Sequence, residues 1–178
     1  MIVPEIEEIA LGDPREVVLE NARRKAAAGV EAAPGGSLVL GADTEVVLDG
    51  RTLGKAVDRA GARNRLEILS ARSHTVLGGV VLLGPGAAAG ELGARCGVAR
   101  SEVTFRDLDH ATIEGYLASG EWRDRAGAYA IQGLGSVLVE RVEGDFSNVV
   151  GLPIRLLLQL APEVFAAAGD SAPKADSD

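Results

Sequence analysis

The sequence predicts an α/β fold in which a mixed, twisted sheet carries helices on its faces around a central cleft. Short β-branched and apolar runs alternate with stretches of helical periodicity. Hairpin signals interrupt this alternation, which favours a mixed sheet over a purely parallel one. The 178 residues are 47% hydrophobic, enough for one domain with a substantial core. We expect that domain over residues 1–167 and a small, polar, fraying tail over residues 168–178.

The first helix is expected to begin after Asp13 and to end at Gly29. Asp13 can cap the helix, Pro14 suits its first turn, and Glu16 completes a capping box. Gly29 is a stop signal, because glycine favours the left-handed backbone that ends many helices.

Lys25 lies on the inward face of this predicted helix. It follows Val18 by seven residues and therefore shares nearly the same face as Val18 and Ala22. A lysine there either covers apolar surface with its long side chain or belongs to a site. The helical pattern alone leaves both readings open.

Two strands, over residues 37–40 and 44–48, are predicted on either side of a small-residue turn that leads into Asp43. Burying an unpaired carboxylate is costly, so Asp43 is expected to have a metal, a lysine or a backbone donor as partner. Lys25 precedes it and Lys55 follows it. This arrangement favours a site in which an acid and a metal act on phosphates.

The later elements follow from the same signals. Asp49-Gly50 is typical of a hairpin turn. Residues 84–93, rich in glycine and alanine, read as a loop between paired strands. The other predictions are helices over 58–70, 112–119 (ended by Gly120) and 153–160, and strands over 74–83, 98–105 and 137–142.

Composition excludes several classes of partner. The formal net charge of −8 argues against a surface that grips a nucleic acid polymer, although a few local cations and a metal can still bind a single nucleotide. No apolar run reaches the roughly 20 residues that span a bilayer, and no leader is recognised, so we expect a cytoplasmic protein with no membrane partner. The single cysteine, Cys96, is expected to be buried and inert.

Eight motifs, taken in order, resemble the Maf family of nucleoside triphosphate pyrophosphatases. Each is weak alone, but their shared order along the chain is a specific signal. They are Ile6-Glu7-Glu8, Asn21-Ala22-Arg23-Arg24-Lys25-Ala26, Gly41-Ala42-Asp43-Thr44, Leu53-Gly54-Lys55, Leu69-Ser70 before His74, Val103-Thr104-Phe105, Ala126-Gly127-Ala128-Tyr129-Ala130-Ile131-Gln132-Gly133 and Asn148-Val149-Val150-Gly151-Leu152-Pro153.

The resemblance implies a fold similar to the inosine triphosphate pyrophosphatase class. It also implies hydrolysis of a nucleoside triphosphate to the monophosphate and pyrophosphate with a divalent cation, Mg²⁺ or Mn²⁺. The form Ile131-Gln132-Gly133 resembles the branch that acts on dTTP and UTP, with modified pyrimidine nucleotides as a further class. Family members are often dimers, so a homodimer is a further expectation.

Six positions take roles from the family motifs. Two of them, Thr44 and Gln132, are linked to substrate choice. The Gln132 carboxamide can both donate to and accept from a base edge, although it can equally bond only to its own loop. The other roles are proton acceptor for Asp43, phosphate binding for Lys25 and Lys55, and metal binding for Glu8 together with Asp43.

This sequence departs from the family pattern in several places. The family opens with a strand and a Ser-x-Ser-Pro-Arg-Arg segment, whereas this sequence begins at Met1-Ile2-Val3-Pro4. We therefore expect a start further upstream or a degenerate member, a fold without the first strand, and weak turnover by the 178-residue chain. Glu45 stands at a usually apolar position, where it either adds a third acid or faces solvent. Arg125 replaces a lysine, which keeps the charge and changes its geometry.

Two further readings follow from these departures. One is a catalytically impaired nucleotide-binding protein with a regulatory role in septum formation, and the other is a purely structural module. An imidazole such as His74 can act as a base, but no family motif gives His74 a role, so we assign it to structure. Trp122 is expected to pack on an exposed loop.

Overall fold

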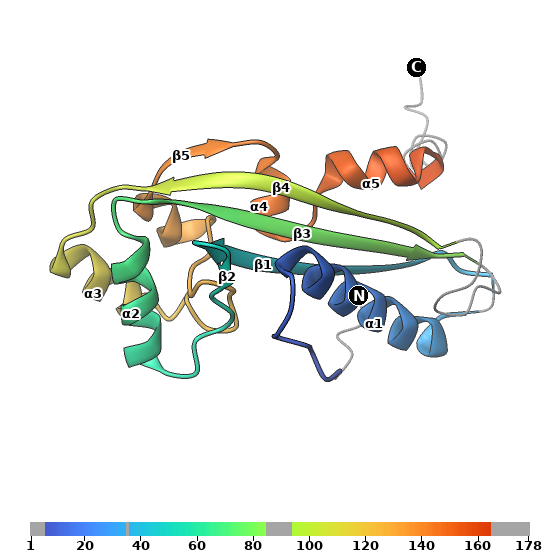
Figure 1. The fold of residues 1–178 in the computed structure, drawn as a ribbon, viewed down its shortest axis with the longest axis horizontal. Coiled ribbons are helices and arrows are strands. Elements are labelled where there is room, and N and C mark those ends of the chain that lie inside the picture. The colour runs from blue at the N-terminus through green and yellow to red at the C-terminus, as the bar shows by residue number, and fades with distance from the viewer. Residues whose placement is uncertain (1–5, 35, 85–93, 165–178) are drawn as a thin grey trace, which may run out of the picture.

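Five strands form one sheet in the computed structural model, which describes residues 6–34, 36–84 and 94–164 (Figure 1). Their order across the sheet is β2-β1-β3-β4-β5, and the four pairings are antiparallel. The α/β class with flanking helices is confirmed, and the described sheet is antiparallel where the sequence predicted a mixed one. The strands are β1 (Val39–Leu48), β2 (Arg51–Thr52), β3 (Ser73–Leu83), β4 (Arg95–Phe105) and β5 (Val139–Glu143).

Strand β1 is continuous, so the predicted turn before Asp43 is wrong. Asp43 pairs with Gly79 in the middle of the β1–β3 ladder. The small residue Gly41 serves helix packing, because a Cβ there would lie 2.1 Å from the carbonyl oxygen of Ala22. The hairpin at Asp49-Gly50 is confirmed, with φ of 51° and 77° as its turn requires.

Helix α1 begins at its predicted cap, Asp13, and α2 begins where predicted, whereas α3 begins at His110, two residues before the predicted start. In α1 (Pro14–Ala32), α2 (Arg59–Leu69) and α3 (His110–Ser119), the first turn donates to the side chain of Asp13, Asp58 and Asp109 respectively. Helix α3 ends at Gly120 in the left-handed conformation, as predicted. Helix α1 instead runs through Gly29, whose missing side chain makes room for Val39 of β1.

The C-terminal part differs most from the sequence prediction. A 3-10 helix, η1 (Gly133–Leu138), precedes β5, so the strand begins at Val139 and not at residue 137. The short helix α4 (Phe146–Val150) was not predicted, and α5 (Ile154–Leu160) agrees with the prediction. The predicted loop at 84–93 (except Gly84) and the tail at 168–178 lie outside the described residues.

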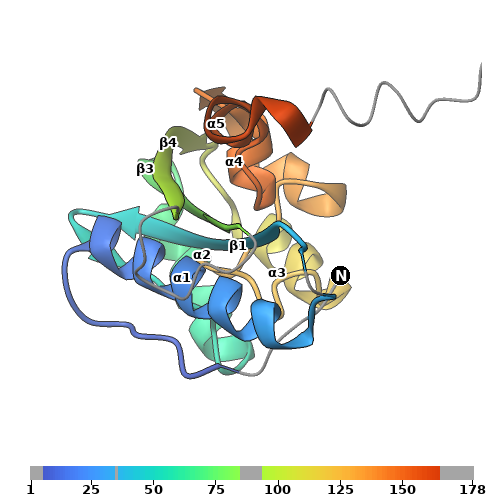
Figure 2. The same cartoon turned by 90° about the vertical axis from the view of Figure 1, so that its right-hand side faces the viewer.

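Helices α1 and α5 cover opposite faces of the same part of the sheet (Figure 2). Alternate residues of β3 separate the two layers, because Val81 and Leu83 pack with α1 whereas Val80 and Leu82 pack with α5. The largest core cluster lies among α2, α3 and the strand ends beside them. None of the helices in the described ranges is both long and apolar enough to cross a membrane.

The structure corrects the predicted exposure of two single residues, Trp122 and Cys96. Trp122 is buried, not on an exposed loop, and its indole nitrogen donates to the carbonyl of Leu117 at 3.2 Å. Its packing role holds. Cys96 is exposed on β4, not buried.

His74 has a structural place, as expected. It is buried, its Nε2 lies 2.8 Å from the hydroxyl of Tyr129, and burial lowers its pKa to about 4.

Candidate active site

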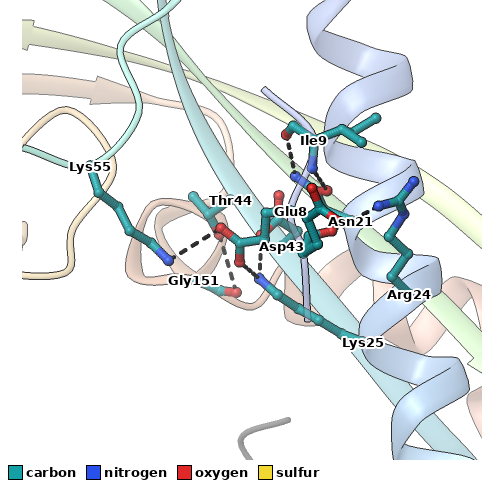
Figure 3. A network of polar contacts seen from close by, with 10 residues as sticks. Glu8, Ile9, Asn21, Arg24, Lys25, Asp43, Thr44, Lys55 and Gly151 are labelled. Atoms are coloured by element: carbon teal, nitrogen blue, oxygen red, sulfur yellow. Dashed lines mark hydrogen bonds and ion pairs between the residues drawn. The ribbon is translucent and has the colours of Figure 1, made fainter. Parts of the chain in front are cut away.

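Two acids and two lysines form one connected network beside β1 (Figure 3). The Lys25 ammonium lies 2.5 Å from Asp43 Oδ1 and 2.8 Å from Glu8 Oε1. The Lys55 ammonium lies 3.3 Å from Glu8 Oε2. Lys25 therefore bridges both acids. Lys55 reaches the network through Glu8 and not through Asp43.

The N-terminal segment that carries Glu8 is fixed against α1. The backbone N–H of Ile9 donates to Asn21 Oδ1 at 2.9 Å, and Asn21 Nδ2 donates to the carbonyl of Ile9 at 3.0 Å. The guanidinium of Arg24 donates to the carbonyl of Glu7 at 2.8 Å. Glu8 thus reaches the site because α1 holds the residues on both sides of it.

Lys55 is held from two directions. It forms an antiparallel bridge with Ala126, and the N–H of Gly127 donates to the carbonyl of Gly54 at 2.9 Å. From α2, Arg65 donates to the carbonyls of Leu53 and Lys55, at 2.7 and 3.2 Å. These bonds fix the backbone and leave the Lys55 side chain half-exposed toward the site.

Burial and charge act in opposite directions on the network. Burial raises the pKa of Asp43, and the Lys25 ammonium offsets this only in part. Burial alone would raise the pKa of Glu8 and lower that of Lys25. Their ion pairs outweigh burial, so the pKa of Glu8 is lowered and that of Lys25 is raised. Lys25 stays cationic at neutral pH, while Asp43 is more basic than an exposed aspartate.

A cavity of about 480 Å³ opens beside this network. Five of the six predicted site residues line it, namely Lys25, Asp43, Thr44, Lys55 and Gln132. The sixth, Glu8, lines an adjoining groove. Thr44 contacts the loop after α4, where its hydroxyl lies 3.4 Å from the carbonyl oxygen of Gly151. The Gln132 side chain does not cap the turn that follows it.

The cavity runs past the edge of β1. Strand β2 pairs with β1 only at Val47 and Leu48, so within the described residues the edge near Asp43 and Thr44 has no neighbouring strand. Side chains on a strand alternate between faces, so Asp43 points toward α1 and Thr44 toward α4. A ligand at this edge can reach both.

The carboxylates suit a divalent cation that arrives with a ligand. Asp43 Oδ2 is buried without a hydrogen-bond partner, which marks an unused oxygen. Mg²⁺ prefers oxygen ligands and is usually bound by one or two carboxylates together with phosphates and water. Among the described residues no three His, Cys, Asp or Glu side chains form a metal cage. Glu8 and Asp43 therefore fit a metal shared with substrate phosphates.

Three charged residues of the cavity wall were not assigned a role from the sequence. Glu121, Asp124 and Arg125 all line the cavity beside Gln132. They follow α3 in the chain, and only Arg125 was considered from the sequence, as a replacement for a lysine. No periodicity marks a turn residue as facing a ligand, so the fold was needed to place them.

Glu45, left open between a third acid and a solvated side chain, lies near the network. Its Oε2 is buried without a hydrogen-bond partner. Burial, with the nearby carboxylates of Asp43 and Glu8, raises its pKa to about 7. It is therefore a third acid near the site and not a fully solvated one.

Comparisons with known proteins show the family of this chain. The model of the family described as "Maf-like protein" matches residues 1–164. A dTTP/UTP pyrophosphatase of Pyrococcus abyssi is 44% identical over 147 residues, which cover 83% of this chain and 75% of that protein. One of Paramagnetospirillum magneticum is 45% identical over 148 residues, 82% and 75% of the two chains. One of Symbiobacterium thermophilum is 44% identical over 162 residues, 89% and 79%.

Proposed function

Because this chain belongs to the Maf family, we propose that it hydrolyses nucleoside triphosphates, dTTP and UTP foremost, to the monophosphate and pyrophosphate. The family and the names of its relatives support a nucleoside triphosphate pyrophosphatase. The observation that carries the proposal is the network in which Glu8, from the adjoining groove, contacts Lys25 and Lys55, which line the cavity together with Asp43. An acid between cations is what cleavage of a polyphosphate requires.

Asp43 is the proton acceptor in this proposal. Water attacks the α-phosphorus, its proton passes to the Asp43 carboxylate, and the bond to the bridging oxygen of the β-phosphate breaks. Pyrophosphate leaves with the electron pair of that bond. The raised pKa of Asp43 makes it a better base than an exposed aspartate.

Lys25 and Lys55 bind phosphate oxygens as compact positive charges. Both ammonium groups already lie at the cavity, and their present partner Glu8 is only partly buried. A divalent cation held by Glu8 and Asp43 would neutralise the charge that develops on the phosphates. Thr44 and Gln132 contact the substrate from the facing walls and select it. Gln132 reads the base through its carboxamide.

The alternative of an impaired nucleotide-binding protein with a role in septum formation is not favoured by the relatives, which carry enzyme names. The homodimer expected from the family stays a prediction.

Substitution of Asp43 by asparagine tests the proposed function. We expect Asp43→Asn to lower pyrophosphate release from dTTP and UTP by about 10²- to 10⁴-fold, the usual contribution of a general base. The melting temperature should stay near that of the wild type, because asparagine keeps the shape of the side chain. Turnover of a folded Asp43→Asn protein at the wild-type rate would remove Asp43 from this role.

A further inference from the structure

The carboxylate of Glu121 holds the backbone that follows Gln132. Glu121 Oε1 accepts from the N–H of Leu134 and Glu121 Oε2 accepts from that of Gly135, each at 3.2 Å. Glu121, Gln132 and Gly133 all line the cavity. One acidic side chain therefore bridges two parts of the same wall.

Glu121 is itself well anchored. It follows Gly120, which ends α3 with a φ of 77°, and its N–H donates to the hydroxyl of Ser119 at 3.1 Å. The next residue, Trp122, is buried and tied to the carbonyl of Leu117. The carboxylate thus projects from a fixed turn.

The segment over residues 133–135, whose backbone bonds to Glu121, is called the clamped segment. Its glycines let it approach the carboxylate and the wall closely. Gly133 has a φ of 65°, and a Cβ on it would lie 2.7 Å from Glu121 Oε1. A Cβ on Gly135 would lie 1.7 Å from the carbonyl oxygen of Ala130. A residue of α3 holds the backbone just before the segment, because the Tyr116 hydroxyl accepts from the N–H of Ala130 at 3.0 Å. These close approaches within the wall explain why glycines stand at this turn.

We propose that Glu121 is a positioning residue that fixes Gln132 at the cavity wall and so sets the preference for pyrimidine over purine nucleotides. This inference rests on the proposed function, because Gln132 is taken as the base-reading residue. The Gln132 side chain does not cap its own turn, so the backbone clamp on the residues behind it governs where its carboxamide lies. A loosened clamp lets the wall move back and admits a larger base, since a small misplacement of a binding group costs much selectivity.

Glu121→Gln tests this inference. Glutamine offers one accepting oxygen where the carboxylate offers two, so one of the two backbone N–H groups loses its partner. We expect the KM for UTP to rise about fivefold or more, and the ratio of kcat/KM for UTP over GTP to fall about tenfold. The value of kcat should change less, because the network of Asp43 is untouched. A general loss of folding would lower kcat for both substrates alike.

Glu140→Gln is the matched control, because Glu140 is exposed on β5 and lines neither cavity. It removes the same charge and should leave the UTP over GTP ratio unchanged. A ratio for Glu121→Gln within twofold of the wild type would overturn the inference, while turnover by the wild type would still support the proposed function.

A second measurement separates failure of the clamp from failure of the enzyme. Hydrogen exchange of the peptide over residues 130–138 should be about fivefold faster in Glu121→Gln than in the wild type and in Glu140→Gln, because a backbone N–H has lost its acceptor. Absence of wild-type turnover would reject the proposed function and with it the effect on selectivity. Unchanged exchange would reject the clamp itself.

Discussion

Glu45 lies two residues after Asp43 on β1, so both side chains leave the strand on the same face, toward α1. Asp43 has Lys25 as its partner there, whereas Glu45 Oε2 has none. The two acids therefore have different effects on the fold. The charge of Asp43 is compensated in part, whereas that of Glu45 has no partner and works against folding.

The pH dependence of stability should show this cost. The folded-state pKa of Glu45 is about 7 and its ordinary value is 4.5, so between these values the folded state binds more protons than the unfolded state. The free energy of unfolding therefore falls as pH rises from 4.5 to 7. We expect Glu45→Gln to be about 1–2 kcal/mol more stable than the wild type at pH 8, after a discount for partial exposure.

Urea unfolding in metal-free buffer at several pH values measures this difference. The advantage of Glu45→Gln should vanish below pH 4.5, where the wild-type carboxyl is protonated in both states. Glu140→Gln, which changes an exposed acid, should show no such advantage. A constant difference between Glu45→Gln and the wild type at all pH values would contradict the argument.

Single residues differ in how far the sequence could place them. Lys25 was predicted to face inward from helical spacing alone, and its contact with Asp43 follows that spacing. Glu8 has no such pattern, because it precedes the helix and reaches the site through Asn21 and Arg24. Its position came from a family motif and needed tertiary structure to explain it.

At the scale of elements, the contact of α1 with the sheet rests on two glycines. A Cβ on Gly41 of β1 would lie 2.1 Å from the carbonyl oxygen of Ala22, and one on Gly79 of β3 would lie 2.5 Å from that of Val18. The helix backbone thus lies directly on the strands. This close approach brings Lys25 within 2.5 Å of Asp43.

Gly41→Ala should disturb both stability and turnover. The added methyl group meets backbone atoms of α1, which cannot rotate away, so we expect a loss of about 1–3 kcal/mol in the free energy of unfolding. The helix must also move outward and carry Lys25 with it, so turnover should fall about tenfold or more in the protein that remains folded. Thermal melting and pyrophosphate release measure the two effects.

Gly115→Ala is the control for this change. Gly115 lies in α3 with open space around it, so alanine there should be tolerated or add about 0.4–1 kcal/mol. Melting of Gly41→Ala at the wild-type temperature would show that α1 can shift at little cost, against the argument.

Elements with strong local signals were predicted well. The Asp13 cap of α1, the start of α2 near Asp58, the hairpin at Asp49-Gly50 and the end of α3 at Gly120 all depend on residues within one turn. The continuity of β1 depends on its ladder with β3 and on the packing of α1, neither of which local spacing reveals. Helix α4 likewise owes its place to Asn148, whose side chain donates to the carbonyl of Val76 at 3.0 Å.

At the scale of the whole molecule, a net charge of −8 opposes the approach of a polyanion. Salt screens that field beyond about 8 Å at physiological ionic strength, so the nearby charges decide. Lys25 and Lys55 supply those charges at the cavity, and they come from segments 30 residues apart that only the fold brings together. The bulk charge of the sequence argues against a nucleic acid polymer as partner, but the arrangement of the local cations became visible only in the structure.

Removal of divalent cations should separate catalysis from folding. Glu8 and Asp43 already have lysine partners, so the fold does not depend on a metal to neutralise them. A metal bound weakly by two carboxylates adds RT ln(1 + [L]/Kd), about 0.4 kcal/mol when its concentration equals Kd. For a chain of this size that corresponds to a melting shift of about 1–2 °C.

We therefore expect EDTA to abolish pyrophosphate release from dTTP while it lowers the melting temperature by no more than about 2 °C. Added Mg²⁺ should restore turnover, and the Asp43→Asn protein, which loses a metal-binding oxygen, should show a smaller Mg²⁺-dependent shift than the wild type. A melting temperature lowered by more than about 10 °C in EDTA would instead identify a metal on which folding depends, as in small zinc domains. Full turnover in EDTA would leave Lys25 and Lys55 to neutralise the phosphates without a cation.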